Sequence, residues 1–184
     1  IYRFFTEASI NLAQDHELLA AMRDCGFNEV FIGIETPSEQ ALRETGKIHN
    51  LKSNMQDAIQ TIQSYGICVM GGFILGFDCD TEDIVDRQID FIHPAGMPKA
   101  MVSILIDLPG TDLYLRLNKE GRILKESGGN NTHCTETNFE TKMDKKQLRN
   151  GYNKVLGTIY NANLSKYYER CSKMLDTIGA PPLF

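Results

Sequence analysis

Gly71-Gly72-Phe73-Ile74-Leu75-Gly76-Phe77-Asp78 is the stretch of this sequence that decides its fold. It ends an apolar run that begins at Ile67, and the acidic segment Asp80-Thr81-Glu82-Asp83 follows it. This order predicts a buried strand over residues 67–75, a turn opened by glycine, and a helix for which Asp80 or Thr81 is the expected cap. A continuous apolar run bounded by glycine is typical of a strand covered on both faces, as in a parallel sheet. Because glycine has no Cβ, the end of this strand can also admit a flat ligand against the backbone.

The same alternation of strand and helix runs on both sides of that stretch. Further strands are predicted over residues 2–6, 29–34 and 100–106, and helices with one apolar face separate them. One helix is expected to begin at Thr36-Pro37-Ser38-Glu39, with Thr36 as its cap and Pro37 at its first position. Strands that alternate with helices pair in parallel through right-handed crossovers. Since a nucleotide-fold glycine signature is absent, we predict an α/β fold in which residues 1–111 form part of a TIM-like (β/α) barrel with four parallel strands.

The pattern changes after Thr111. A short helix is predicted around Leu113, Leu115 and Leu117, and a loop rich in Gly, Asn and Thr follows it. Two more helices are predicted over residues 144–160 and 165–178. Residues 112–184 are therefore expected to form an α-helical C-terminal appendage.

Composition excludes several classes of protein. The chain has 184 residues, 42% of them hydrophobic and 23% charged, which is typical of a globular domain. Its net charge is −5 and its Lys and Arg residues are scattered, which argues against a nucleic-acid partner. No apolar run is long enough to span a membrane, no signal-peptide pattern opens the chain, and five widely spaced cysteines favour a reducing cytoplasm. Because the sequence begins with Ile1 rather than methionine, we expect it to be a piece of a longer protein.

Candidate site residues follow from the predicted strand order. In parallel (β/α) folds, ligands bind at the carboxyl ends of the strands. Those ends carry acidic residues, hydroxyl groups or glycine: Glu7, Ser9, Glu35, Thr36, Gly76, Asp78 and Asp107. An acidic edge of this kind suits a ligand that has positive charge, hydroxyl groups or a metal. Thr36 and Asp80 have an alternative reading as helix caps, and the four histidines lack the spacing of metal ligands. A phosphate loop is excluded because Phe77-Asp78 stands where Lys-Ser/Thr is required, and the dinucleotide fingerprint is absent.

At this point the motifs resemble a known family. Gly72, Ile74 and Gly76 resemble the Gly-x-Ile-x-Gly motif of the radical S-adenosylmethionine superfamily, although Cys79 occupies the place of the acid that ends it. Residues 31–36 are similar to the fourth-strand segment of that superfamily, and residues 108–111 to the turn after its sixth strand. One branch matches over essentially the whole chain, the cobalamin-binding radical enzymes with a C-terminal helical domain, through residues 6–9, 33–38, 72–78 and 120–122.

The resemblance implies a fold, cofactors and residue roles. The chain corresponds to strands three to six of the radical barrel plus the helical domain, and the Cys-x3-Cys-x2-Cys motif for the 4Fe-4S cluster and the cobalamin domain lie upstream of it. Glu35 is then expected to bind the ribose of S-adenosylmethionine, with Thr36 and Asp78 beside the cofactor. Glu7 and Ser9 are expected to face its amino-acid end or its ribose. The adenine is expected to lie on a shelf formed by Gly72, Ile74 and Gly76, with the side chain of Leu108 against its other face.

Three functions remain open at this stage. The first is a fragment of a radical S-adenosylmethionine enzyme, cobalamin-dependent and served by a reductant such as flavodoxin or ferredoxin. The second is a non-catalytic (β/α) binding or scaffold module, and the third is a barrel enzyme that uses Glu35 with Glu7 or Asp78 as an acid–base pair. Under the first function we expect the 184 residues alone to be inactive, with an unpaired edge on the first strand that favours association. The small-molecule substrate is not predicted.

Overall fold

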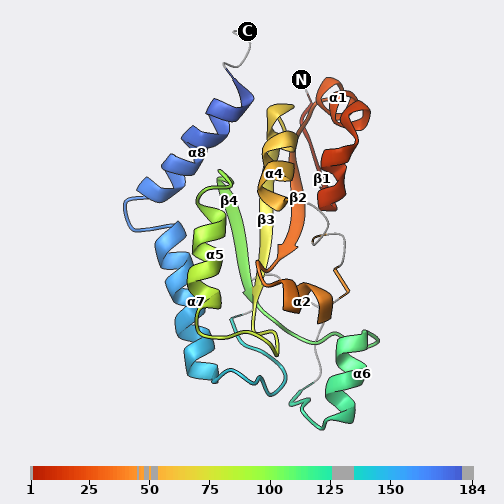
Figure 1. Cartoon of the computed structure of the whole chain (residues 1–184), viewed down its shortest axis with the longest axis vertical. Coiled ribbons are helices and arrows are strands. Elements are labelled where there is room, and N and C mark those ends of the chain that lie inside the picture. The colour runs from red at the N-terminus through yellow and green to blue at the C-terminus, as the bar shows by residue number, and fades with distance from the viewer. Residues whose placement is uncertain (1, 45, 48–49, 51–53, 126–134, 180–184) are drawn as a thin grey trace.

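The computed structural model describes residues 2–44, 46–47, 50, 54–125 and 135–179 (Figure 1). Four strands pair in sequence order, and all three pairings are parallel. The strands are β1 (Phe4–Ala8), β2 (Phe27–Glu35), β3 (Cys68–Leu75) and β4 (Lys99–Ile104). The predicted α/β class with four parallel strands is confirmed, as is the helical part that follows them. Strand β1 lies two residues later than the predicted range 2–6. Strand β2 begins at Phe27, before the predicted start at residue 29, because Gly26, with φ of 94°, ends the preceding helix there.

Helices cover one face of this sheet. The 3-10 helix η1 (Ile10–Gln14) and the helices α1 (His16–Cys25), α4 (Met55–Ser64), α5 (Ile84–Ile92) and α7 (Lys145–Ile159) contribute to a single core with the strands. Side chains alternate along each strand, so that Val30, Ile32 and Ile34 of β2 are fully buried against this layer. Phe31, between them, points to the opposite face and lines a cavity there.

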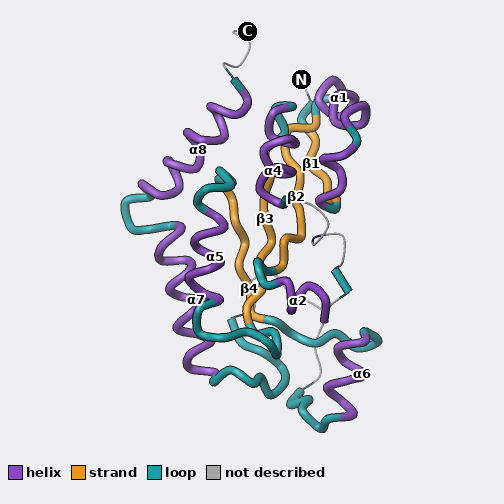
Figure 2. Tube along the Cα trace, in the orientation of Figure 1, coloured by secondary structure: helices purple, strands orange, loops and turns teal. Residues whose placement is uncertain are grey.

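The carboxyl ends of the strands converge on one end of the sheet. Figure 2 shows the loops after β3 and β4 gathered at that end, together with α2 (Glu39–Glu44) and α6 (Asp112–Lys119). At the other end Lys99 donates to both carboxylate oxygens of Glu29, at 2.7 and 3.0 Å. This ion pair joins β2 to β4 across the face that the helices leave open.

The predicted helix caps Thr36 and Asp80 are wrong, because their side chains accept hydrogen bonds from other backbone N–H groups. Helix α2 begins at Glu39, and the Ser38 hydroxyl accepts from the N–H of Ala41, so neither Thr36 nor Pro37 has the predicted position. Helix α5 follows Asp83. Asp80 instead caps the turn after β3, where its carboxylate accepts from the backbone N–H groups of Gly76 and Phe77 at 2.8 and 3.0 Å, and burial raises its pKa to about 6.

Arg170 fastens the C-terminal helices to the sheet. It belongs to α8 (Ser165–Ile178) and its side chain is completely buried. The guanidinium donates to the carbonyls of Met97 and Pro98, just before β4, and to that of Ile159 at the end of α7. It also lies over the ring of Tyr160, whose hydroxyl bonds both the N–H and the carbonyl of Ala100 on β4. The core therefore continues from the sheet into residues beyond 111, while the predicted division into 1–111 and 112–184 stays a prediction.

A second set of polar contacts joins the turn after β3 to α6 and the residues that follow it. Asp78 accepts two hydrogen bonds from Arg122, at 2.6 and 2.8 Å, and one from Arg116 at 2.6 Å. Its side chain is 5% exposed. Hydrogen bonds from Arg122 and Arg116 outweigh the effect of burial and hold the pKa of Asp78 at about 2. We name Asp78, Arg116 and Arg122 the arginine clamp.

Arg170→Met is expected to destabilise the fold by roughly 2–4 kcal/mol, because buried carbonyls lose their donor. Chemical denaturation measures this difference. Arg149→Met is the matched control, since Arg149 is exposed and, among the residues that the structure describes, forms an ion pair only with Glu136; it should change stability by no more than about 0.5 kcal/mol. Equal effects of the two substitutions would contradict the assignment of Arg170 as a structural anchor.

Asp78→Asn is expected to destabilise the protein at pH 7 by about 1–2 kcal/mol, and the deficit should vanish on acidification. The folded-state pKa of about 2 lies below the ordinary value of about 3.9, so the clamp stabilises the fold above pH 4 and is lost as the pH falls toward 2. Chemical denaturation of the variant and of the unmodified protein at several pH values between 7 and 2 measures the difference in their free energies of unfolding. A difference that is independent of pH would show that the clamp is not ionic.

Candidate functional site

The open face of the sheet holds a cavity to which all four strands contribute. We call it the inner-face cavity; its volume is about 420 Å³. Glu7 of β1 and Glu35 of β2 lie along it with Gly72 and Ile74 of β3. Four of the residues predicted from the sequence therefore meet at one place. Apolar residues form much of the rest of the lining, and the side chains of Phe73 and Val102 among them point into the core on the other face of the sheet: Phe5, Phe31, Met70, Phe73, Met101 and Val102.

Glu35 has an unusual backbone conformation. Its φ is 67°, in the left-handed region that side chains other than glycine rarely adopt, and the register of β2 with β3 shifts between Gly33 and Glu35. The side-chain amide of Asn50, which is 2% exposed, donates to the carbonyls of Gly33 and Ile34 at 3.1 and 3.2 Å. Asn50 thus holds the irregular end of β2 in place. Backbone strain of this kind concentrates at functional sites.

The carboxylate of Glu35 lies back over the strand. A Cβ at Gly33 would come within 2.6 Å of its Oε1, so this position of the carboxylate requires glycine. Lys47 forms an ion pair with Glu35 at 3.0 Å, and 16% of the Glu35 side chain is exposed. The geometry leaves Glu35 as a fixed, ionised hydrogen-bond acceptor at the edge of the inner-face cavity.

Gly72 has a different neighbour from the one predicted. A Cβ there would lie 2.5 Å from the ring of Phe31, so the aromatic side chain covers this part of the strand. A flat ligand reaches the backbone of Gly72 only when the ring of Phe31 turns aside. The sequence prediction did not include Phe31 among the site residues.

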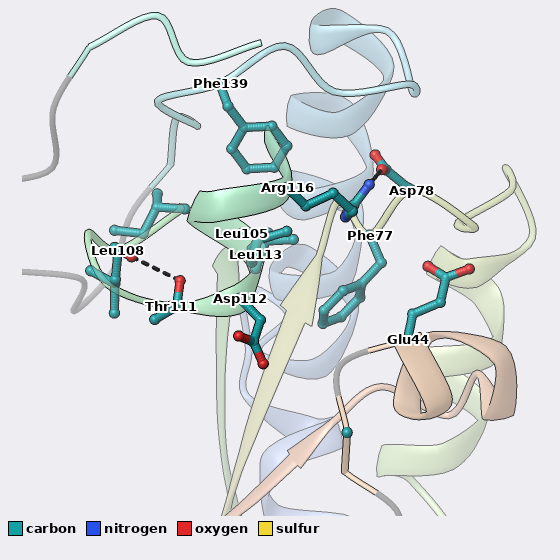
Figure 3. Close-up of a pocket in the computed structure, with 12 residues that line it drawn as sticks. Glu44, Phe77, Asp78, Leu105, Leu108, Thr111, Asp112, Leu113, Arg116 and Phe139 are labelled. Carbon is teal, nitrogen blue, oxygen red and sulfur yellow. Dashed lines mark hydrogen bonds and ion pairs between the residues drawn. The ribbon is translucent and has the colours of Figure 1, made fainter. Parts of the chain in front are cut away.

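A second cavity lies at the carboxyl edge of the sheet, and we call it the edge cavity (Figure 3). Its volume is about 490 Å³. Asp78 and Leu108, both predicted to lie beside the cofactor, line this cavity and not the inner-face cavity. The two cavities share no lining residue, but they adjoin along the strands, since Ile74 lines one and Phe77 the other.

The other predicted residues line neither cavity. The hydroxyl of Ser9 donates to Asn11, and the buried Thr36 accepts from the N–H of Ser38. Gly76, with φ of 107°, faces Leu148 of α7. Asp107 is buried, and Asn138 binds both its N–H and its carbonyl. Burial raises the pKa of Asp107, and its carboxylate has no hydrogen-bond partner among the described residues.

The sequence carried little signal for Lys47 and Asn50. Lys47 pairs with Glu35 and Asn50 binds the two residues before it, and nothing in the neighbours of Lys47 and Asn50 marks them as part of a site. Among the described residues, no group of three or more His, Cys, Asp or Glu side chains could hold a metal. The same residues include no helix that is long and apolar enough to cross a membrane.

Comparison with known proteins shows which proteins this chain is similar to. Residues 111–183 match a family described as a domain of unknown function (DUF4070). An uncharacterized methyltransferase of Synechocystis sp. is 36% identical over 98% of this chain and 33% of its own length. The hopanoid C-2 methylase of Rhodopseudomonas palustris is 39% identical over 65% of this chain and 23% of its own length.

A third relative is more distant. The bacteriochlorophyllide d C-12(1)-methyltransferase of Chlorobaculum tepidum is 27% identical over 61% of this chain and 25% of its own length. The chain thus spans between about a quarter and a third of the length of these relatives. The order of the sequence motifs, the parallel sheet and these matches lead to one assignment: the chain belongs to the cobalamin-binding radical S-adenosylmethionine family.

Proposed function

We propose that this chain is the S-adenosylmethionine-binding part of a cobalamin-dependent radical methyltransferase. The observation that carries the proposal is Glu35, an ionised carboxylate fixed on a strained strand end and aimed along the inner-face cavity. The methyltransferase names of its relatives support methyl transfer as the reaction. In the complete protein, upstream residues would supply the 4Fe-4S ligands and the cobalamin domain.

The residues of the inner-face cavity fit the proposed cofactor. Carboxylates accept hydrogen bonds from a vicinal diol, so Glu35 would bind the ribose hydroxyls. Glu7, also on the cavity, would face the ammonium or sulfonium charge of the same molecule. Phe31, Ile74 and Met101 provide apolar surface for the adenine. When bound, S-adenosylmethionine, the iron–sulfur cluster and cobalamin would supply the radical and methyl-transfer chemistry, while this chain orients the cofactor and excludes water.

The contacts of Glu35 favour this function over an acid–base pair. Its carboxylate pairs with Lys47 and lies over Gly33, a fixed position that suits an acceptor of hydrogen bonds from hydroxyl groups. Asp78, one of the two acids considered as its partner, lines the other cavity and has both carboxylate oxygens bound by guanidinium groups of the arginine clamp. We further propose a cytoplasmic protein served by a reductant such as flavodoxin or ferredoxin.

Glu35→Gln in the full-length protein is expected to weaken the binding of S-adenosylhomocysteine about tenfold or more, since hydrogen bonds to a charged group contribute roughly 1.5–3 kcal/mol. Isothermal titration measures the affinity, and iron content should not change. Glu39→Gln is the matched control, because that side chain is 78% exposed and its one ion pair within the described part of the chain is with Arg43. Unchanged affinity in the Glu35 variant would remove this residue from the site.

Gly33→Ala tests the position of the carboxylate without removing it. The new methyl group would displace Oε1 of Glu35, so we expect weaker binding of S-adenosylhomocysteine with little loss of stability. Gly157→Ala on α7 is the control, since a Cβ there meets no atom within 4 Å. The proposal fails if both alanine variants bind the ligand as the unmodified protein does.

A further inference from the structure

The edge cavity is built from two parts of the chain. One wall comes from the carboxyl edge of the sheet and carries Phe77, Leu105, Ile106 and Leu108. The facing wall comes from the region matched by the domain of unknown function, through Leu113 of α6 and Phe139 (Figure 3). A volume of about 490 Å³ is in the range of cavities that hold small molecules.

Specific contacts fix the second wall against the first. The arginine clamp ties α6 and Arg122 to Asp78, and the guanidinium of Arg122 lies 5.8 Å from the ring centre of Phe139. Thr111 caps α6, because its hydroxyl accepts from the N–H of Tyr114 and donates to the carbonyl of Leu108. The cavity is therefore preformed, and a ligand does not have to order its walls.

The charges around the cavity restrict the kind of ligand. The charges of the arginine clamp are balanced, because Arg116 and Arg122 pair with Glu120 as well as with Asp78. Glu44 and Asp112 also line the cavity, and neither carboxylate has an ion-pair partner among the described residues. An acidic ligand would meet unbalanced negative charge, whereas an uncharged or cationic one would not.

We propose that the edge cavity binds the methyl acceptor, and that this acceptor is a largely apolar molecule without acidic groups on the part that enters. The inference rests on the proposed function, because it places the acceptor next to a cofactor on the inner face. Ile74 of the inner-face cavity and Phe77 of the edge cavity are three residues apart, about 10 Å along the chain. The domain of unknown function then supplies half of the substrate site.

The test uses the full-length protein and Nile red, an uncharged apolar dye, titrated by fluorescence. Leu113→Asp places a charge in the cavity wall and is expected to weaken dye binding at least tenfold. Leu115→Asp is the matched control on the same helix, because Leu115 is 59% exposed and does not line the cavity. Leu113→Trp fills the cavity without introducing charge and should also weaken binding, whereas Leu115→Trp should not.

Three outcomes would overturn the inference. Dye affinity that is the same in the Leu113 and Leu115 variants would place the dye elsewhere. Displacement of the dye by saturating S-adenosylhomocysteine would assign the cavity to the cofactor. Equally tight binding of the anionic dye 1-anilinonaphthalene-8-sulfonate at this site would remove the restriction on charge. S-Adenosylhomocysteine affinity in the Leu113 variants should stay unchanged, which separates this inference from the proposed function, tested at Glu35.

Discussion

The left-handed backbone at Glu35 is the constraint on which the candidate site depends. A residue with a side chain adopts this conformation at a cost of about 1–3 kcal/mol, so the surrounding structure must hold it. Asn50 provides that hold through its hydrogen bonds to Gly33 and Ile34, and Gly33 leaves the space that the carboxylate occupies. The strain and its compensation are both local to the end of β2. A site that needs one acceptor in a fixed place gains from such rigidity.

The C-terminal region takes part in the fold and forms one wall of the edge cavity. Helix α7 packs in the same core as the sheet, and Arg170 binds backbone carbonyls on either side of that junction. The arginine clamp makes a second junction at the opposite end of β4. Because the buried, charged Asp78 binds Arg116 of α6, the clamp that positions α6 relative to the sheet also shapes the edge cavity.

Sequence reasoning located the strands because each has an apolar run or a period of two that needs no knowledge of its partners. It brought Glu7 and Glu35 together because parallel strands end at a common edge. It did not foresee that Asp78 lies at the edge cavity, because its partners Arg116 and Arg122 lie about 40 residues further along the chain and carry no local signal. The caps of α2 and α5 were misassigned for a related reason, since Thr36 and Asp80 each had a choice of nearby N–H groups and tertiary packing decided between them.

The most direct test of the account is a structure of the full-length protein with S-adenosylhomocysteine bound. The account predicts that the ribose hydroxyls lie within hydrogen-bonding distance of the Glu35 carboxylate, with the adenine against the inner face of the sheet. A ligand whose ribose is held by other residues, while the inner face stays free of it, would contradict the central claim.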